Sequence, residues 1–387
     1  MNPGRIICMY RVALKMLYGD PSKYLGLVLG MAFSVLLVNQ QAGIMINLIG
    51  RLASMIADVP AATIWVMDPG VPNADTIVPM RDTELARVRS VDGVLWAVPM
   101  LKATGTIHTP SGLVTAVTYY GVDDATLVGV PQEVVMGHLD DLKLADAVAI
   151  DADGYQKIWP GEPLQLGRVL EMNDHRARLV AILRVTPPFT TIPQIYTRYS
   201  NGLNYVDSRR HYLSFILASH HPGSDPAQVA RKISRSTGLA AWSSAEYRDR
   251  TINWAYQKTA LPYNFLLIIA MGVMVGALVV GLMFHLFITE NLKQYAVIKA
   301  MGVKNRRIVL MVLVQAFVAG VAGYCIGIGM AAGFFNLVRE TSSFRGIEMR
   351  QDVALVSLVL AITISLASSM FSLRKVLILD PATVFRS

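Results

Sequence analysis

Long uncharged apolar segments lie near both ends of the chain and limit what it can fold into. They cover residues 25–49, 259–289, 308–338 and 353–373. Each is long enough to cross a hydrocarbon layer of about 30 Å, because an α-helix rises about 1.5 Å per residue. We therefore expect four transmembrane helices with these bounds.

The first of these segments has two possible interpretations. Asn39, Gln40 and Gln41 interrupt it, and the part before them, Leu25 to Val38, is short enough to be a signal-peptide core. A cleavable signal needs small residues just beyond its core, and Asn39 to Asn47 offers no convincing pair. We expect an uncleaved helix whose polar triplet faces another helix or emerges from the bilayer.

The distribution of charge predicts the topology. The chain has a formal charge of +8, yet residues 47–260 hold 20 basic and 21 acidic residues, so the excess lies beside the apolar segments. Residues 290–307 are strongly basic, whereas residues 339–352 are balanced. The positive-inside rule then places both termini and residues 290–307 in the cytoplasm of a bacterial inner-membrane protein. A basic excess in this position indicates contact with membrane lipid and argues against binding nucleic acid.

The remaining segments follow from this topology. Residues 1–24 form a cytoplasmic amphipathic segment, residues 339–352 a short periplasmic loop and residues 374–387 a cytoplasmic tail. Residues 50–258 lie outside and alternate short strand-like runs with two clear helices. The expected strands are 63–67, 114–120, 147–150, 179–185 and 212–218, and the expected helices, each opened by an aspartate cap, are 82–90 and 225–237. We predict a periplasmic α+β domain inserted between transmembrane helices 1 and 2.

Motifs for catalysis are absent from the sequence. It contains no GxxxxGK[ST] phosphate loop, HExxH, GxSxG or CxxC motif, and His220 and His221 have no third metal ligand nearby. Cys8 and Cys325 lie in a cytoplasmic flank and in an apolar segment, so no disulfide is expected. We predict no catalytic, cofactor-binding or metal-binding residues, and therefore no enzyme.

Pairs of glycines four residues apart recur in the apolar segments. Such pairs allow two helix backbones to approach closely, although glycine is also common in membrane helices. The pattern predicts a packed bundle, with helix-packing positions at Gly272, Gly276, Gly323 and Gly327.

The most informative stretch runs from Thr289 to Gln315 and reads TENLKQYAVIKAMGVKNRRIVLMVLVQ. A short amphipathic helix should end near Ala300, since Gly302 would stop it. This stretch resembles the cytoplasmic coupling segment of FtsX/MacB-type ABC permeases, and its YAxxKAMG form is similar to the DevC-like branch. The C-terminal sequence, with Arg374, Asp380-Pro381-Ala382 and Phe385, is similar to the closing motif of the same family.

The resemblance implies a function and a set of partners. It implies the permease subunit of an ABC exporter, working as a dimer, in which a separate ATPase subunit binds ATP and its motion is transmitted to the periplasmic domain. It further implies a periplasmic adaptor and a TolC-like outer-membrane protein. The residues that match the coupling motif are Glu290, Lys293, Tyr295, Ala296, Lys299, Ala300 and Gly302.

Other functions remain open for this architecture. The same layout is used to release lipoproteins or to activate cell-wall hydrolases, and the absence of an adaptor would favour these alternatives. A membrane-anchored sensor is a further alternative from another class, but the cytoplasmic segments are short for a signalling output.

Overall fold

The computed structural model describes residues 3–206, 212–339 and 346–378. Two compact units divide the chain: residues 48–259 form one, and residues 1–47 with 260–387 form the other. We refer to these as the outer domain and the helical unit, and we describe each by itself.

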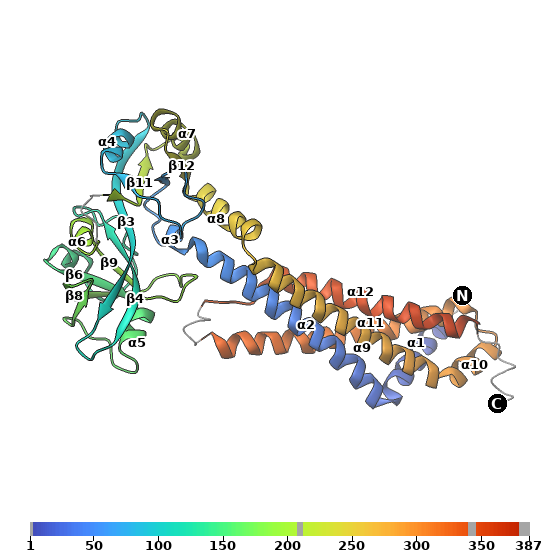
Figure 1. The fold of residues 1–387 in the computed structure, drawn as a ribbon. Coiled ribbons are helices and arrows are strands. Elements are labelled where there is room, and N and C mark those ends of the chain that lie inside the picture. The colour runs from blue at the N-terminus through green and yellow to red at the C-terminus, as the bar shows by residue number, and fades with distance from the viewer. Residues whose placement is uncertain (1–2, 207–211, 340–345, 379–387) are drawn as a thin grey trace. The chain divides into compact units, whose positions relative to one another are not determined.

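The helical unit contains the four predicted apolar segments as long helices (Figure 1). Their length and composition suit a membrane crossing, and α9 has a mean hydropathy of 2.8. A helix of 17 residues precedes them and a nine-residue helix joins α9 to α11. The bounds are α1 Pro3–Gly19, α2 Pro21–Gly50, α9 Leu261–Glu290, α10 Leu292–Ala300, α11 Asn305–Val338 and α12 Gln351–Ile378. The four-helix expectation is therefore confirmed.

Helix α2 packs against the other long helices through small and polar residues. The Nδ2 group of Asn39, which is buried, donates a hydrogen bond of 2.8 Å to Oγ of Ser357 on α12. Of the polar triplet, Asn39 thus faces another helix. This is one of the two positions that we expected for the triplet. Ser34 donates from its Oγ to the backbone carbonyl of Gly272 on α9 at 3.2 Å.

The outer domain is built on a mixed sheet of ten strands in the order β12-β1-β11-β3-β4-β9-β6-β8-β5, with β7 pairing β3 and β8. Most pairs are antiparallel, but β4 with β9 and β6 with β8 are parallel. The strands are β1 Ile64–Met67, β3 Val94–His108, β4 Val114–Val122, β5 Val134–Gly137, β6 Ala147–Asp151, β7 Val169–Met172, β8 His175–Leu183, β9 Gln194–Arg198, β11 Phe215–His220 and β12 Ala240–Ser243. A separate pair joins β2 Met80–Arg81 to β10 Tyr212–Leu213.

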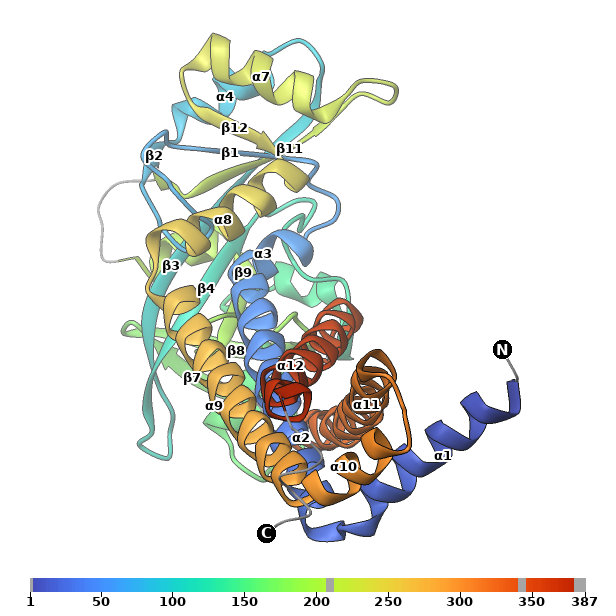
Figure 2. The ribbon, with the colours of Figure 1, turned by 90° about the vertical axis from the view of Figure 1, so that its right-hand side faces the viewer.

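Short helices cover both faces of this sheet (Figure 2). Strand β1 shows the pattern: Ile64 and Val66 pack with residues of α4 and α7, while Trp65 and Met67 pack with Tyr247 of α8 on the opposite face. Side chains alternate along a strand, so a strand covered on both faces must be apolar throughout. The helical segments are η1 Arg51–Ala53, α3 Ser54–Ala57, α4 Thr83–Arg89, η2 Leu139–Lys143, α5 Ala152–Ile158, α6 Tyr199–Asn204, α7 Pro226–Thr237 and α8 Ser244–Lys258.

The outer domain confirms the α+β expectation and corrects some of its details. Asp225 caps α7, accepting at its side chain from the backbone N–H of Ala227, but Asp82 makes no such bond at α4. The strand expected over 179–185 begins earlier, at His175, and ends at Leu183. The strand expected over 212–218 is two strands, β10 and β11.

Helices α8 and α9 are separated by Thr259 and Ala260 alone. Pro262 lies in the first turn of α9, where its missing N–H costs no helical hydrogen bond. An uninterrupted helix through this point would bring the proline ring against the carbonyl of Lys258, so the chain breaks there.

Candidate functional site

The predicted coupling segment forms a short helix between two long ones, at one end of the helical unit. Asn291 ends α9 and begins α10. Its backbone N–H and its side-chain Nδ2 both donate to the carbonyl of Phe287, at 3.2 and 2.8 Å. The backbone bond is the last regular turn of α9, and the side-chain bond adds a second donor to the same carbonyl, which fixes the turn into α10.

Gly302 ends α10 with a left-handed backbone, at φ +84°. The N–H of Gly302 donates to the carbonyl of Lys299 at 3.0 Å, and the N–H of Val303 donates to that of Ile298 at 3.4 Å. This pair of bonds is the Schellman arrangement, which favours glycine at its left-handed position. The sequence expectation that Gly302 stops the helix is therefore confirmed.

One face of α10 is buried in the helical unit. Tyr295 and Ala296 are fully buried and Leu292 and Lys299 are partly buried, at the spacing of a single helix face. The Tyr295 hydroxyl donates to Oε1 of Gln315 on α11 at 3.1 Å, and Nε2 of Gln315 donates to the carbonyl of Ala13 on α1 at 2.7 Å.

These two bonds, the Tyr295–Gln315–Ala13 link, join three helices inside an apolar cluster that includes Leu17 and Met311. Burial raises the pKa of the Tyr295 phenol, which keeps it a neutral donor. Figure 2 shows α10 beside α1 and α11 at this end of the unit. Because a buried polar group is costly to leave unpaired, the link holds α10 in one position.

The opposite face of α10 is exposed and carries an apolar pair. Val297 is 43% exposed and Met301 is 70% exposed, and their spacing of four residues places them on one face. Lys293 precedes the pair in sequence, Lys304, Arg306 and Arg307 follow it, and all four are also exposed. We call this group the Val297–Met301 surface. Exposed apolar side chains with charged residues near them in the chain are the composition of a protein interaction site.

The structure separates the seven coupling residues predicted from sequence into three groups. Lys293, Ala300 and Gly302 are exposed. Tyr295 and Ala296, which match the coupling motif, are buried and anchor the helix, together with the partly buried Lys299. Glu290 forms an ion pair with Lys23, which also pairs with Asp20, so it ties the end of α9 to the start of α2.

The four predicted packing glycines all lie where another helix comes close. A Cβ atom added to Gly276 would lie 2.4 Å from Cβ of Ser34, and one added to Gly272 would lie 3.1 Å from Leu37. On α11, added Cβ atoms at Gly323 and Gly327 would lie 2.5 Å from Met31 and 2.6 Å from the carbonyl of Ala32. All four contacts are with α2, so these glycines allow α2 to approach both α9 and α11.

Four apolar helices, an α+β domain between the first and second of them, and a short anchored helix between the second and third define an ABC transporter permease. Two family models match this chain: the MacB-like periplasmic core domain over residues 24–236 and the FtsX-like permease C-terminal domain over residues 266–381. The chain belongs to this family of MacB-like and FtsX-like permeases. It is a membrane protein with a domain of the periplasmic type.

Individual relatives are distant. Two uncharacterised ABC transporter permeases, from two strains of Mycobacterium tuberculosis, are each 24% identical over 312 residues, covering 80% of this chain and 79% of the relative. The periplasmic region of MacB from Actinobacillus actinomycetemcomitans has 13% identity and a TM-score of 0.39, over 53% of this chain and 96% of that one. The extracellular domain of the ABC-type transporter YknZ from Gram-positive bacteria has 14% identity and a TM-score of 0.35, over 47% and 98%.

Proposed function

We propose that this permease transmits the ATP-driven motion of a separate ATPase subunit through α10 to the outer domain. The observation that supports this proposal is that α10 has one buried face and one exposed face. One face is anchored by the Tyr295–Gln315–Ala13 link, and the other presents the Val297–Met301 surface. A force on the exposed face therefore passes to α1, α9 and α11 together.

The partner that fits the Val297–Met301 surface has an apolar groove with acidic residues around it. Complementary charge would orient the two proteins as they meet. The apolar pair Val297 and Met301, once covered by the partner, would supply most of the affinity. Two copies of the chain with two such ATPase subunits form the proposed unit, with ATP bound by the ATPase. Both termini and α10 face the cytoplasm of an inner membrane in this proposal, consistent with the basic residues at 293–307.

A periplasmic adaptor and an outer-membrane duct complete the proposed path. This part depends on the resemblance of the coupling stretch to the DevC-like branch, and the exporter role depends on it as well. Recovery of an ATPase without an adaptor from native membranes would instead favour lipoprotein release or hydrolase activation.

Two variants of α10 separate binding from transmission. Val297→Asp with Met301→Asp should abolish recovery of the ATPase with the tagged chain, because charges replace the apolar centre of the surface. Tyr295→Phe should leave recovery intact but reduce the ATP-dependent change in hydrogen exchange of the outer domain, because the link to Gln315 is lost. Normal ATPase recovery by the double variant would contradict the proposal, as would full transmission by Tyr295→Phe.

A further inference from the structure

Helices α9 and α12 pack side by side in the helical unit (Figure 1), and a groove of about 510 Å³ lies between them. Its α9 residues lie between Ala277 and His285, and its α12 residues lie between Ala367 and Phe371. The α9 side is about 12 Å long. Both helices belong to the same compact unit, so the groove does not depend on where the outer domain lies.

The groove has an apolar lining along most of its length. Ala277 and Gly281, one helical turn apart on α9, contribute little or no side chain. Leu278, Leu282 and Phe371 are 66%, 55% and 75% exposed, so their side chains project as walls beside these small residues. Such a lining suits a hydrocarbon chain better than a water-soluble ligand.

Gly281 differs from the packing glycines of the same helix. A Cβ atom added to Gly272 or Gly276 would lie within 3.1 Å of an α2 side chain. One added to Gly281 would meet only Oγ of Ser368, at 3.7 Å, which is an ordinary van der Waals contact. No neighbouring helix therefore requires glycine at position 281, and the missing side chain leaves space in the groove instead.

Ser368 differs from the other hydroxyl-bearing residues of α12. Its hydroxyl has no hydrogen-bond partner in the ranges that the structure describes, and its Oγ lies next to Gly281. A helical serine usually bonds to a carbonyl of the preceding turn. The other hydroxyls of the helix all donate to backbone carbonyls, and they belong to Ser357, Thr363, Ser365, Ser369 and Ser372.

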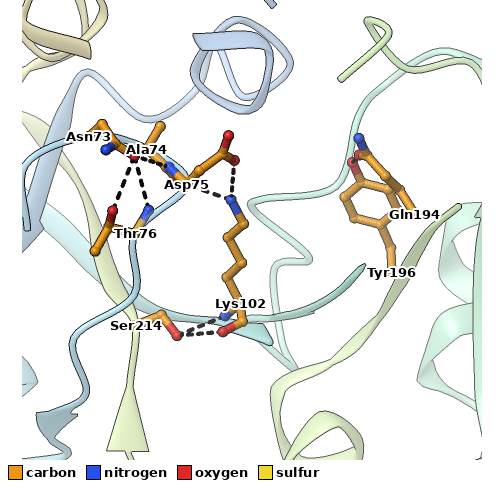
Figure 3. A network of polar contacts seen from close by, with 8 residues as sticks. All are labelled: Asn73, Ala74, Asp75, Thr76, Lys102, Gln194, Tyr196 and Ser214. Atoms are coloured by element: carbon orange, nitrogen blue, oxygen red, sulfur yellow. Dashed lines mark hydrogen bonds and ion pairs between the residues drawn. The ribbon is translucent and has the colours of Figure 1, made fainter. Parts of the chain in front are cut away.

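The outer domain shows how this chain pairs a buried serine with its own groups (Figure 3). The hydroxyl of Ser214 donates to the backbone carbonyl of Lys102 and accepts from its N–H, both at 2.9 Å. Ser368 has no such pairing among the described residues. An unpaired hydroxyl is costly in hydrocarbon, where no water replaces the missing bond. A ligand with a hydrogen-bond acceptor would remove this cost.

The acceptor that fits this position is the ester carbonyl of a membrane lipid. The backbone of a bound helix could not supply one, because helical carbonyls already bond within their own helix. Helix α9 has 30 residues, about 45 Å, and its end from His285 to Glu290 spans about 7.5 Å. In a bilayer with about 30 Å of hydrocarbon and 40–45 Å in total, His285 then lies where the headgroups meet the acyl chains. The esters of a phospholipid lie at this level.

We propose that the groove between α9 and α12 binds one acyl chain of an ester-linked phospholipid. The chain lies along Ala277 and Gly281, between the leucine and phenylalanine walls. Its ester carbonyl accepts from the Ser368 hydroxyl, and the His285 ring lies beside the glycerol end of the lipid. The proposal requires that α9 and α12 cross the membrane, and it is independent of any coupling to an ATPase.

Native mass spectrometry of the intact, delipidated chain tests this assignment with two probes. One is phosphatidylethanolamine with two oleoyl esters, and the other has the same headgroup and chain length but ether links, which lack the carbonyls. Ser368→Ala removes the donor, and its control is Thr363→Val, which removes an exposed hydroxyl bonded within α12. Gly281→Leu fills the groove, and its control is Gly329→Leu, where an added Cβ meets nothing within 4 Å.

The parent and both controls should bind the ester lipid about fivefold more tightly than the ether lipid, which is the effect of one neutral hydrogen bond. Ser368→Ala should abolish this preference, and Gly281→Leu should lower the occupancy of both lipids. If Gly281→Leu does not fold, the Ser368→Ala comparison decides alone.

Equal binding of the two lipids by the parent would overturn the proposal, as would a preference for the ester lipid that persists in Ser368→Ala. Unchanged lipid occupancy in folded Gly281→Leu would overturn it as well. If that variant also loses a dimer that the parent forms, the groove belongs to a second copy of the chain.

Discussion

Thr251 is a fully buried residue of α8 whose hydroxyl has no hydrogen-bond partner among the described residues. Thr197 is equally buried, but its hydroxyl donates to the carbonyl of Ala147 at 2.8 Å and accepts from Asn201 at 3.0 Å. The two residues therefore give a matched pair for measuring what a buried hydroxyl contributes to stability.

We expect Thr251→Val to leave the melting temperature of the intact chain unchanged or to raise it. Thr197→Val should lower the free energy of unfolding of the outer domain by about 1–3 kcal/mol, because it removes both the donor to the Ala147 carbonyl and the acceptor of the shortest hydrogen bond of the Asn201 amide. Thermal unfolding followed by tryptophan fluorescence measures both. A Thr251→Val variant that melts as low as Thr197→Val would show that the Thr251 hydroxyl is paired in solution.

The roles of individual residues in α10 could be predicted only in part. Gly302 was identifiable because a helix followed by glycine and a basic run has one simple interpretation. The burial of Tyr295 and Ala296 was not, since the nine-residue helix has apolar residues on two sides. Leu292, Tyr295 and Ala296 form one side, and Val297, Ala300 and Met301 form the other. In the structure, the side with Tyr295 packs in an apolar cluster with α1 and α11 and bonds to Gln315, and these tertiary contacts could not be predicted from the sequence of α10.

At the scale of elements, the contact between α2 and α9 depends on the absence of a side chain at Gly276. We expect Gly276→Leu to lower the yield of monodisperse protein and its melting temperature in detergent, through overpacking worth about 1–3 kcal/mol. Gly329 on α11 is the control, because a Cβ added there meets nothing within 4 Å. Unchanged stability of Gly276→Leu, measured beside Gly329→Leu, would mean that α2 and α9 do not pack closely.

Strand β3 was the element least predictable from sequence. Its 15 residues include Pro99 and Gly105, which both disfavour strands, so no strand was expected there. The structure explains how Pro99 is tolerated. Residues 94–100 pair with β11, whereas pairing with β4 begins only at Leu101, so Pro99 needs no donor on that side. This arrangement depends on tertiary pairing, which local sequence does not encode.

The long apolar helices were the most predictable elements. Each has a continuous apolar composition that no soluble element of similar length requires, so the pattern alone defines it. Their polar contacts, such as Asn39 with Ser357, join residues far apart in sequence and required the structure.

At the scale of the whole molecule, the proposed topology predicts which loops face the cytoplasm. In a chain with Cys8 and Cys325 replaced, a cysteine at Lys304→Cys should react with a membrane-impermeant maleimide only after permeabilisation. A cysteine at Glu348→Cys should react in intact spheroplasts, as should one at Asp140→Cys in the outer domain. We expect this labelling pattern because basic residues are concentrated at 293–307, and basic loops stay in the cytoplasm. Labelling of Lys304→Cys in intact spheroplasts would show that the topology is the opposite of the one proposed.

The outer domain is connected to the helical unit by two segments of unequal stiffness. Helix α2 continues without interruption to Gly50 and leads directly into η1, whereas α8 and α9 are separated by Thr259 and Ala260. A continuous helix resists both bending and twisting, while two non-helical residues act as a joint that allows rotation but keeps the ends together. The chain therefore enters the outer domain through a continuous helix that resists bending, and it leaves the domain through a two-residue joint.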